Sequence, residues 1–449
     1  MRDRHRPGRG RWRRGGHRPA VFAALVTAVV AVTLFAVSQQ DGRAAPSYFF
    51  GTLQTGPGTA RQERDKGIGV AHLPIYWDRV EPVRGHIDTA YVAGVKDALR
   101  TFQDAGMKVE AGLGLNHPPG WVLDRHPGNS YTDQNGREYT DSPNLAFSQE
   151  LRNEAQGYLQ WLDRDIGLRN FWAIRIGVND TGEYAYPPPG DGERTAFWAF
   201  DRHAQASGRD PGRPATVPPN PYPDWRPGQQ TYRGEPFTPQ QADRWYAWYL
   251  GALADTVNWQ IRQFDALHYP GILKVLIPGG GLQPRDLSAA LRVRLAPTAQ
   301  GGLVGRGSAY FRTIPMILHH GNVQLVSTAL VDGSGTPRNN VCRPQDAAVD
   351  VRALATGSGP ADLVGTWSSV RWVARIAAET GFPVSGESAG PEVESYHPGV
   401  MNDAARQMTT CGLKGLMWAF DRNLYDGTPG SSLEDYAAVI ARLDKGSTP

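Results

Sequence analysis

Carboxyl groups and an amide follow an apolar stretch near the middle of the chain. Residues 171–178 read FWAIRIGV, and Asn179, Asp180 and Glu183 come within the next five positions. Glu387 follows another short apolar stretch, FPVSG. A carboxylic acid donates a proton, and a carboxylate accepts one or attacks an electrophilic carbon. Two such groups on opposite sides of a substrate could therefore carry out acid–base or nucleophilic catalysis.

The elements around these residues alternate between strand-like and helical patterns. Strands are predicted at residues 47–54, 67–77, 107–115, 171–178, 272–281, 322–331, 382–388 and 413–420. Clear helices are predicted at residues 89–106, 146–167, 242–268 and 433–444. Alternation of this kind implies right-handed crossovers and a parallel sheet. Eight such units imply a closed (β/α)8 TIM barrel with long loops.

In a (β/α)8 barrel the chemistry lies at the carboxyl ends of the strands and in the loops that follow them. Polar residues within the later part of the predicted strands or just past them are therefore the candidate site. They are His72, Asn116, His117, Asn179, Asp180, Glu183, Glu387, Trp418 and Asp421. The strand-four acids and Glu387 on strand seven would face each other across the mouth of the barrel.

Two of the predicted loops are long. More than fifty residues separate Glu183 from the next predicted helix, and roughly thirty separate His117 from its helix. Long loops in a compact domain are usually functional. These loops are rich in aromatic residues, namely Trp121, Tyr131, Tyr139, Tyr184, Tyr186, Trp198 and Trp225. We expect them to form the walls of a cleft; the alternative is that they pack the loops themselves.

Several motifs resemble those of clan A glycoside hydrolases. They are LPIYWDRVEPVRGHIDTAYV at residues 73–92, NHPPGW at 116–121 and SGES at 385–388. Residues 131–150 are similar to the same region of family 42 β-galactosidases. The resemblance implies a glycosidase that cleaves β-linked oligo- or polysaccharides by a retaining mechanism with two carboxyl groups. It also implies Glu387 as the nucleophile, for which a salt bridge to a neighbouring arginine is the structural alternative.

The strand-four motif GVNDTGEYAYPP resembles two patterns at once. Its NDTG is similar to the Asn-Glu-aromatic-Gly of clan A, with Asp180 in place of the acid/base glutamate. Its GEYAYP resembles the β-amylase motif, in which the glutamate is the general acid. We favour Glu183 as the acid/base, with Asp180 orienting it or binding a sugar hydroxyl. Two alternatives remain: a β-amylase-like inverting hydrolase, and an inactive barrel that only binds glycan.

The resemblance also implies roles in substrate binding. Asn179 would bind a sugar 2-hydroxyl, and Trp418 would form a platform for a sugar ring. His72 stands where clan A often has an arginine. The full set of substrate-binding candidates is Asn179, His117, Asn116, His72, Trp121, Tyr186 and Trp418.

The pattern of the first 46 residues predicts a targeting segment followed by a linker. Residues 1–18 hold eight arginines and one aspartate, and residues 20–37 are uncharged and largely apolar. We expect a basic cytoplasmic flank at 1–18, a signal anchor or signal peptide at 19–38, a linker at 39–46 and a catalytic domain at 47–449. An uncleaved segment would anchor the protein to a membrane. Either alternative puts the catalytic domain outside the cytoplasm, secreted or on the cell surface.

Composition excludes several function classes. The net charge of +3 comes from the basic first 18 residues, so the remainder is mildly acidic and does not predict nucleic-acid binding. No cluster with metal-ligand spacing appears, and we expect no metal or other cofactor. Cys342 and Cys411 could form a disulfide in an oxidising compartment, and the sequence leaves this open. No signal for an oligomeric state is present.

Overall fold

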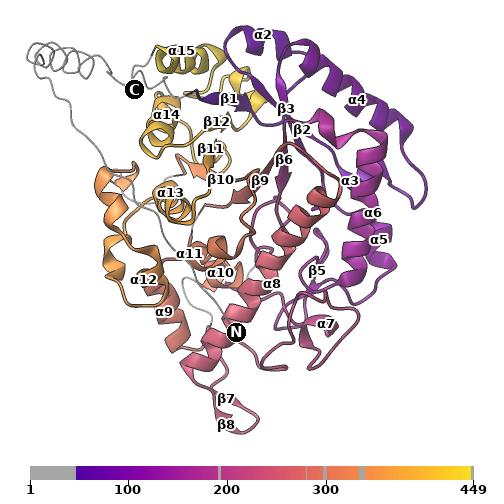
Figure 1. Cartoon of the computed structure of the whole chain (residues 1–449), viewed down its shortest axis with the longest axis vertical. Helices are drawn as coiled ribbons and strands as arrows, with labels where there is room; N and C mark the ends of the chain where they lie inside the picture. The colour runs from indigo at the N-terminus through magenta and orange to yellow at the C-terminus, as the bar shows by residue number, and fades with distance from the viewer. Residues whose placement is uncertain (1–46, 191–193, 280, 297–300, 333–338, 446–449) are drawn as a thin grey trace, which may run out of the picture. The chain divides into compact units, whose positions relative to one another are not determined.

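Eight parallel strands close into a barrel at the centre of the molecule (Figure 1). The computed structural model describes residues 47–190, 194–279, 281–296, 301–332 and 339–445. In order around the barrel the strands are β1 (Phe49–Thr52), β12 (Gly415–Trp418), β11 (Val384–Ser388), β10 (Val323–Leu330), β9 (Ile272–Ile277), β6 (Ala173–Ile176), β3 (Lys108–Gly112) and β2 (Val70–Pro74). Each lies within one of the eight predicted stretches, so the (β/α)8 fold class is confirmed.

Helices follow the strands and cover the outside of the barrel (Figure 1). The longer ones are α2 (Ala60–Asp65), α4 (Thr89–Asp104), α6 (Gln149–Asp165), α8 (Pro239–Ala266), α9 (Pro284–Arg292), α13 (Ser369–Thr380), α14 (Val400–Thr410) and α15 (Leu433–Asp444). The four that were predicted are present. Local signals explain their ends: Thr238 and Gln241 form a capping box at α8, and Gly381 ends α13 in the left-handed conformation.

The connections between strands also carry short elements. These are α3 (Trp77–Val80), α5 (Gly120–Asp124), α7 (Arg202–Gln205), α10 (Gly301–Gly305), α11 (Tyr310–Thr313) and α12 (Val351–Ala355). Two small hairpins lie in the long loops, β4 (Tyr131–Thr132) with β5 (Glu138–Tyr139) and β7 (Thr231–Tyr232) with β8 (Glu235–Pro236). Cys342 and Cys411 form a disulfide, which joins the segment after β10 to the end of α14.

Aromatic side chains fill the long loops from within. Tyr131, Tyr184, Tyr186, Trp198 and Trp225 all have 0% of their surface exposed. Rings stack directly on one another, as Tyr186 does on Tyr249 with centroids 4.1 Å apart. Most of these aromatics therefore pack the loops, and the expectation that they line a cleft is wrong for the buried ones.

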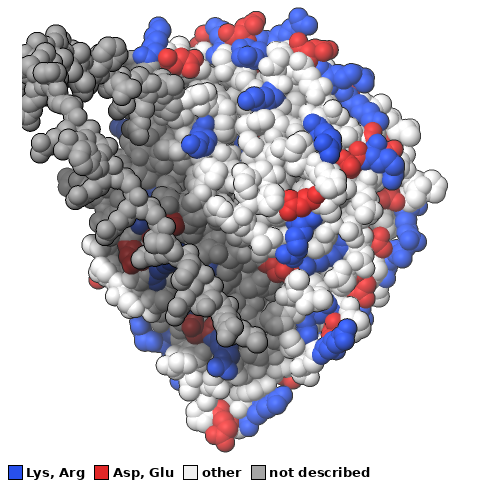
Figure 2. All heavy atoms as spheres, viewed as in Figure 1, with Lys and Arg blue, Asp and Glu red and all other residues white. Residues whose placement is uncertain are grey.

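The surface carries charges of both signs. On the face shown in Figure 2, basic and acidic side chains of the described residues are interspersed. Within the described ranges, no helix is both long and apolar enough to cross a membrane. The predicted targeting segment and linker, residues 1–46, lie outside the described residues.

Candidate active site

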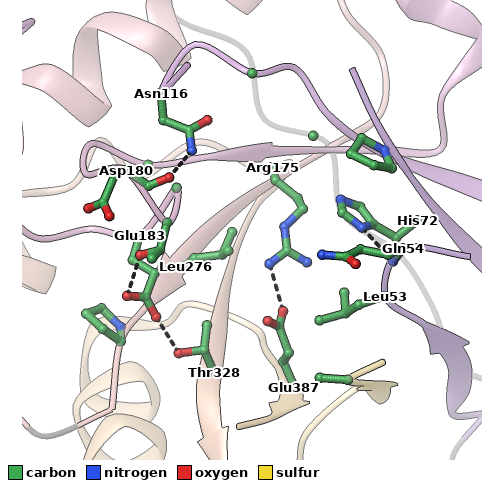
Figure 3. Close-up of a pocket in the computed structure, with 18 of the residues that line it drawn as sticks. Leu53, Gln54, His72, Asn116, Arg175, Asp180, Glu183, Leu276, Thr328 and Glu387 are labelled. Carbon is green, nitrogen blue, oxygen red and sulfur yellow. Dashed lines mark hydrogen bonds and ion pairs between the residues drawn. The ribbon is translucent and has the colours of Figure 1, made fainter. Parts of the chain in front are cut away.

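A cavity of about 910 Å³ opens at the carboxyl ends of the strands. Every barrel strand, or the loop that follows it, contributes to its lining. Predicted site residues in this lining are His72, Asn116, His117, Asp180, Glu183 and Glu387. The fold thus brings together all three predicted catalytic carboxyl residues and three of the seven predicted substrate-binding residues (Figure 3).

Glu183 is placed by a tight turn after β6. The backbone N–H of Val178 donates to the carbonyl of Glu183 at 2.8 Å, and the N–H of Glu183 donates to Oδ1 of Asn179 at 2.7 Å. A Cβ on Gly177 would lie 1.9 Å from the carbonyl oxygen of Gly182, so only glycine permits this close approach. The turn projects the Glu183 carboxyl into the cavity, between the hydroxyls of Thr181 and Thr328.

Asn179 is a structural part of that turn. Its side chain is fully buried, and Oδ1 accepts from the Glu183 N–H and lies 2.9 Å from the Thr181 hydroxyl. It does not line the cavity. We had expected Asn179 to contact a sugar hydroxyl; the structure instead uses its side chain to hold Glu183.

Asp180 lines the same cavity but points elsewhere. Figure 3 shows its carboxylate directed away from Glu387. Its backbone carbonyl accepts a hydrogen bond from the amide of Asn116. The Tyr139 hydroxyl has its pKa raised by burial and by the neighbouring Asp180 carboxylate, which places these two groups together. Of the two strand-four acids, Glu183 is therefore better placed to act opposite Glu387.

Glu387 lies near the end of β11 and forms an ion pair with Arg175 of β6. Nη2 of Arg175 donates to Oε2 of Glu387 at 2.8 Å, and the two side chains point toward each other in Figure 3. Burial raises the pKa of Glu387, Arg175 opposes this, and the charge of Glu183 adds to the rise. A nearby negative charge acts in this direction because it disfavours ionisation of the carboxyl.

Arg175 belongs to a group of charges inside the barrel. Its Nη1 donates to Glu110 of β3 at 3.1 Å, and Glu110 also contacts the ammonium of Lys274 on β9. Glu110 and Lys274 are fully buried. Burial alone would raise the pKa of Glu110, but Lys274 and Arg175 hold it below its usual value. The interior is thus charged at this level of the barrel.

His72 of β2 lines the cavity as a neutral ring. Its Nδ1 lies 3.1 Å from the backbone nitrogen of Gln54 and accepts its hydrogen, so the ring proton is on Nε2. Burial, with help from the charge of Arg175, lowers the pKa of His72 to about 3. Nε2 has no hydrogen-bond partner among the described residues. The ring therefore lines the cavity without a charge, and its Nε2–H is shielded from solvent.

Three predicted substrate-binding aromatics lie outside the cavity lining. Trp418 is fully buried and donates from Nε1 to Ser431 at 2.9 Å. Tyr186 is fully buried and donates to the carbonyl of Tyr249. Trp121 packs edge-on against Trp77 and donates to the carbonyl of Glu81. Trp418 and Tyr186 are enclosed by protein, and the half-buried Trp121 does not line the cavity, so none of the three forms the expected sugar platform there.

Several cavity residues were not identified from the sequence. They include Gln54, Tyr76, Arg175, Arg306, Thr328, Asp332 and Phe420. A usable signal existed for Arg175, and for Glu110 and Lys274 behind it. Each is a charge with an apolar residue on either side within a strand, so a buried side chain there must face a partner in the interior. Among the described residues, no group of three or more His, Cys, Asp or Glu side chains is arranged to hold a metal ion.

The chain was compared with protein-family models, curated sequences and solved structures. No protein-family model matches the chain, and no curated protein matches its sequence. The solved catalytic domain of a β-amylase from Paenibacillus polymyxa matches with a TM-score of 0.59 at 14% identity, over 90% of this chain and 100% of that one.

Two β-galactosidases match as well. The enzyme from the psychrophilic Marinomonas ef1 has a TM-score of 0.52 at 11% identity, over 88% of this chain. The enzyme from Bacillus circulans sp. alkalophilus has a TM-score of 0.51 at 11% identity, over 90% of this chain. This chain spans 59% and 57% of the two galactosidases. At these identities the likeness shows the fold, and the predicted barrel common to β-amylases and β-galactosidases is confirmed.

Proposed function

We propose that the protein is a glycoside hydrolase, with Glu183 as acid/base and Glu387 as nucleophile. The observation that carries this proposal is that both carboxyls enter one cavity at the mouth of the barrel, from strands separated by β9 and β10. Hydrolysis of a glycosidic bond needs two carboxyl groups on either side of the bond. Solved barrels of the same fold that are named for glycosidase activities add support.

The contacts around Glu183 hold its carboxyl in place. The hydroxyl of Thr181 lies 2.9 Å from Oε2, the hydroxyl of Thr328 lies 2.8 Å from Oε1, and a guanidinium nitrogen of Arg306 lies 3.6 Å from Oε2. Each hydroxyl also has a second acceptor, Oδ1 of Asn179 for Thr181 and the carbonyl of Ile277 for Thr328. A hydroxyl can donate to a carboxylate or accept from a carboxylic acid, so these contacts allow the carboxyl to give up and regain a proton.

Glu387 has a different requirement, because a nucleophile must be ionised. The guanidinium of Arg175 favours the carboxylate form and fixes Oε2, which leaves Oε1 for a substrate. In the first step, Glu387 attacks the anomeric carbon while the bond to the leaving oxygen breaks and that oxygen takes the proton of Glu183. In the second step, Glu183 takes a proton from water, whose oxygen displaces Glu387. Both residues end in their starting states.

The charge of the cavity favours neutral sugars. Its lining contains four carboxyl groups, of Asp180, Glu183, Asp332 and Glu387, and two guanidinium groups, of Arg175 and Arg306. An excess of acidic groups repels uronic acids and sulfated sugars. We therefore propose neutral β-linked oligo- or polysaccharides as the substrate class, with no cofactor.

The experiment that tests the function is a screen of aryl glycosides. The panel pairs neutral β- and α-glycosides with the matching glucuronides, and uses Glu387→Gln as the inactive control. Proton NMR of the first-formed product then gives its anomeric configuration. Turnover of a neutral β-glycoside with retention supports the proposal. Inversion would favour the β-amylase-like alternative, and binding of glycans without any turnover would favour the inactive barrel.

We also propose that the protein acts outside the cytoplasm, secreted or anchored at the cell surface. The Cys342–Cys411 disulfide supports this, because disulfides persist in oxidising compartments. Blocking free thiols in protein taken directly from its native host tests the proposal. We expect no thiol to react until a reductant is added, and two reactive thiols in untreated protein would contradict it.

A further inference from the structure

A row of four alternating charges crosses the interior of the barrel. Lys274 of β9 contacts Glu110 of β3, Glu110 pairs with Arg175 of β6 at 3.1 Å, and Arg175 pairs with Glu387 of β11 at 2.8 Å. Each member comes from a different strand. Only Arg175 and Glu387 line the cavity, so Glu110 and Lys274 lie behind it.

Burial makes the inner pair costly as a means of holding the fold together. Glu110 and Lys274 each have 0% of their surface exposed. Taking two charges out of water is unfavourable, and apolar replacements of similar volume are often as stable or more stable. Stability alone is therefore a weak explanation for this pair, and its direct connection to Arg175 indicates another role.

We propose that Glu110 and Lys274 are positioning residues, which hold Arg175 against Glu387 and share its charge. The proposal rests on the proposed role of Glu387 as nucleophile. A guanidinium has a planar fork of donors, and here one nitrogen of the fork is fixed by Glu110 while another faces Glu387. Glu110 thereby sets the rotation of Arg175, and it keeps Arg175 from fully neutralising the Glu387 carboxylate.

Lys274 completes the row from its far end. Its ammonium holds the second oxygen of Glu110, and it lies 4.5 Å from the ring centre of Phe49 and 4.8 Å from that of Trp172. Aromatic faces stabilise a buried cation without adding a hydrogen-bond acceptor. Glu110 is therefore the main anion facing Lys274, and the position of each charge is determined by the next one in the row.

The charges around Glu387 predict the effect of altering the row. The groups that act on it are Arg175 from β6, Glu110 from β3, Lys274 from β9, Glu183 from the loop after β6 and Tyr396 from the loop after β11. Neutral His72 from β2 lines the same cavity. Burial raises the pKa of Glu387, Arg175 lowers it, and Glu110 raises it. Removing the charge of Glu110 should therefore lower the pKa of Glu387.

The test is Glu110→Gln in the full chain. The pKa of Glu387 is read from the 13C NMR signal of its carboxyl, assigned by its loss in Glu387→Gln, and needs no turnover. We expect this pKa to fall and the acid limb of kcat to move to lower pH. Because a fully neutralised and less firmly held carboxylate is a poorer nucleophile, we also expect kcat to fall about 10- to 100-fold, with a much smaller change in KM.

Two further variants keep the test decisive. Glu110→Gln/Lys274→Met removes both inner charges, so it avoids an unpaired buried ammonium and should show the same direction of change. Asp346→Asn breaks the buried Arg371–Asp346 ion pair, which lies outside the cavity lining, and should change neither the Glu387 signal nor the pH profile. A Glu387 pKa that is unchanged or raised in both row variants would overturn the proposal. If instead the pKa of Glu387 falls as expected but the wild type hydrolyses no glycoside, the proposed glycosidase function is wrong. The proposed effect of Glu110 and Lys274 on Arg175 and Glu387 would still hold.

Discussion

Nη2 of Arg175 lies 2.8 Å from Oε2 of Glu387, and this contact joins the fourth strand of the barrel to the seventh at the floor of the cavity. An ion pair of this kind is also what a purely structural glutamate would form. One feature distinguishes Glu387 from such a residue, because it lines the cavity that Glu183 also lines. The contact therefore fixes a carboxyl at the cavity wall.

Replacing Arg175 should change the pH dependence of catalysis. Arg175 lowers the pKa of Glu387, and Arg175→Met removes that effect while the side chain keeps much of its volume. The pKa of Glu387 should then rise, so the acid limb of kcat should move to higher pH. This direction is opposite to that expected for Glu110→Gln. Identical pH profiles for wild type and Arg175→Met would contradict the role of the ion pair.

Glu183 and Asp180 can be separated by the leaving group of the substrate. Loss of a general acid costs about 10²- to 10⁴-fold when the leaving group needs a proton. Glu183→Gln should lose this much on an alkyl or phenyl glycoside and far less on a dinitrophenyl glycoside. Asp180→Asn, the matched control at the same turn, should lose less than about tenfold on both. Steady-state kinetics of both variants with the two substrates tests this assignment. A large loss that depends on the leaving group in Asp180→Asn, and not in Glu183→Gln, would make Asp180 the general acid.

His72 should remain neutral across the usual working range of pH. Burial lowers the pKa of His72 to about 3, so the ring should carry no charge between pH 5 and 8. The 15N NMR shifts of its ring nitrogens, assigned by their loss in His72→Phe, should therefore stay constant over this range. A change in these shifts centred near pH 6.5 would contradict the neutral state.

The same lowered pKa of His72 predicts the acid sensitivity of the fold. The unfolded chain takes up a proton on His72 near pH 6.5, and the folded chain does so only near pH 3. Stability is therefore lost as pH falls through this window, at about 1.4 kcal/mol per pH unit from this group. Thermal unfolding of wild type and His72→Phe from pH 7 to pH 4 measures the effect. The variant should show the smaller decline, and parallel curves would contradict the assignment.

Much of the fold could be predicted because strand and helix signals repeat regularly along the chain. All eight barrel strands and the four clearest helices lie within or close to the predicted stretches. The polar groups in β2 and β11 and in the loops after β3 and β6 also reach one cavity, since parallel strands place their carboxyl ends together.

The rest of the site depends on side-chain directions, which sequence patterns do not provide. Tyr186 lies in a long loop and Trp418 ends strand β12, yet both rings turn into the core. Asn179 stands beside Asp180, yet it holds the turn and leaves the cavity to its neighbours. Glu110 and Lys274 were not identified from the sequence because they lie within largely apolar strands. A buried charge at such a position nevertheless requires a buried partner.

The central claim, that Glu387 attacks the sugar opposite Glu183, is tested most directly with Glu387→Ala and azide. The measurement is turnover of an activated neutral β-glycoside by this variant, with and without azide, followed by product analysis. We predict no measurable turnover without azide, because the nucleophile is absent, and restored turnover with azide that yields a glycosyl azide of inverted configuration. Turnover at the wild-type rate without azide would contradict the account, as would the absence of any glycosyl azide.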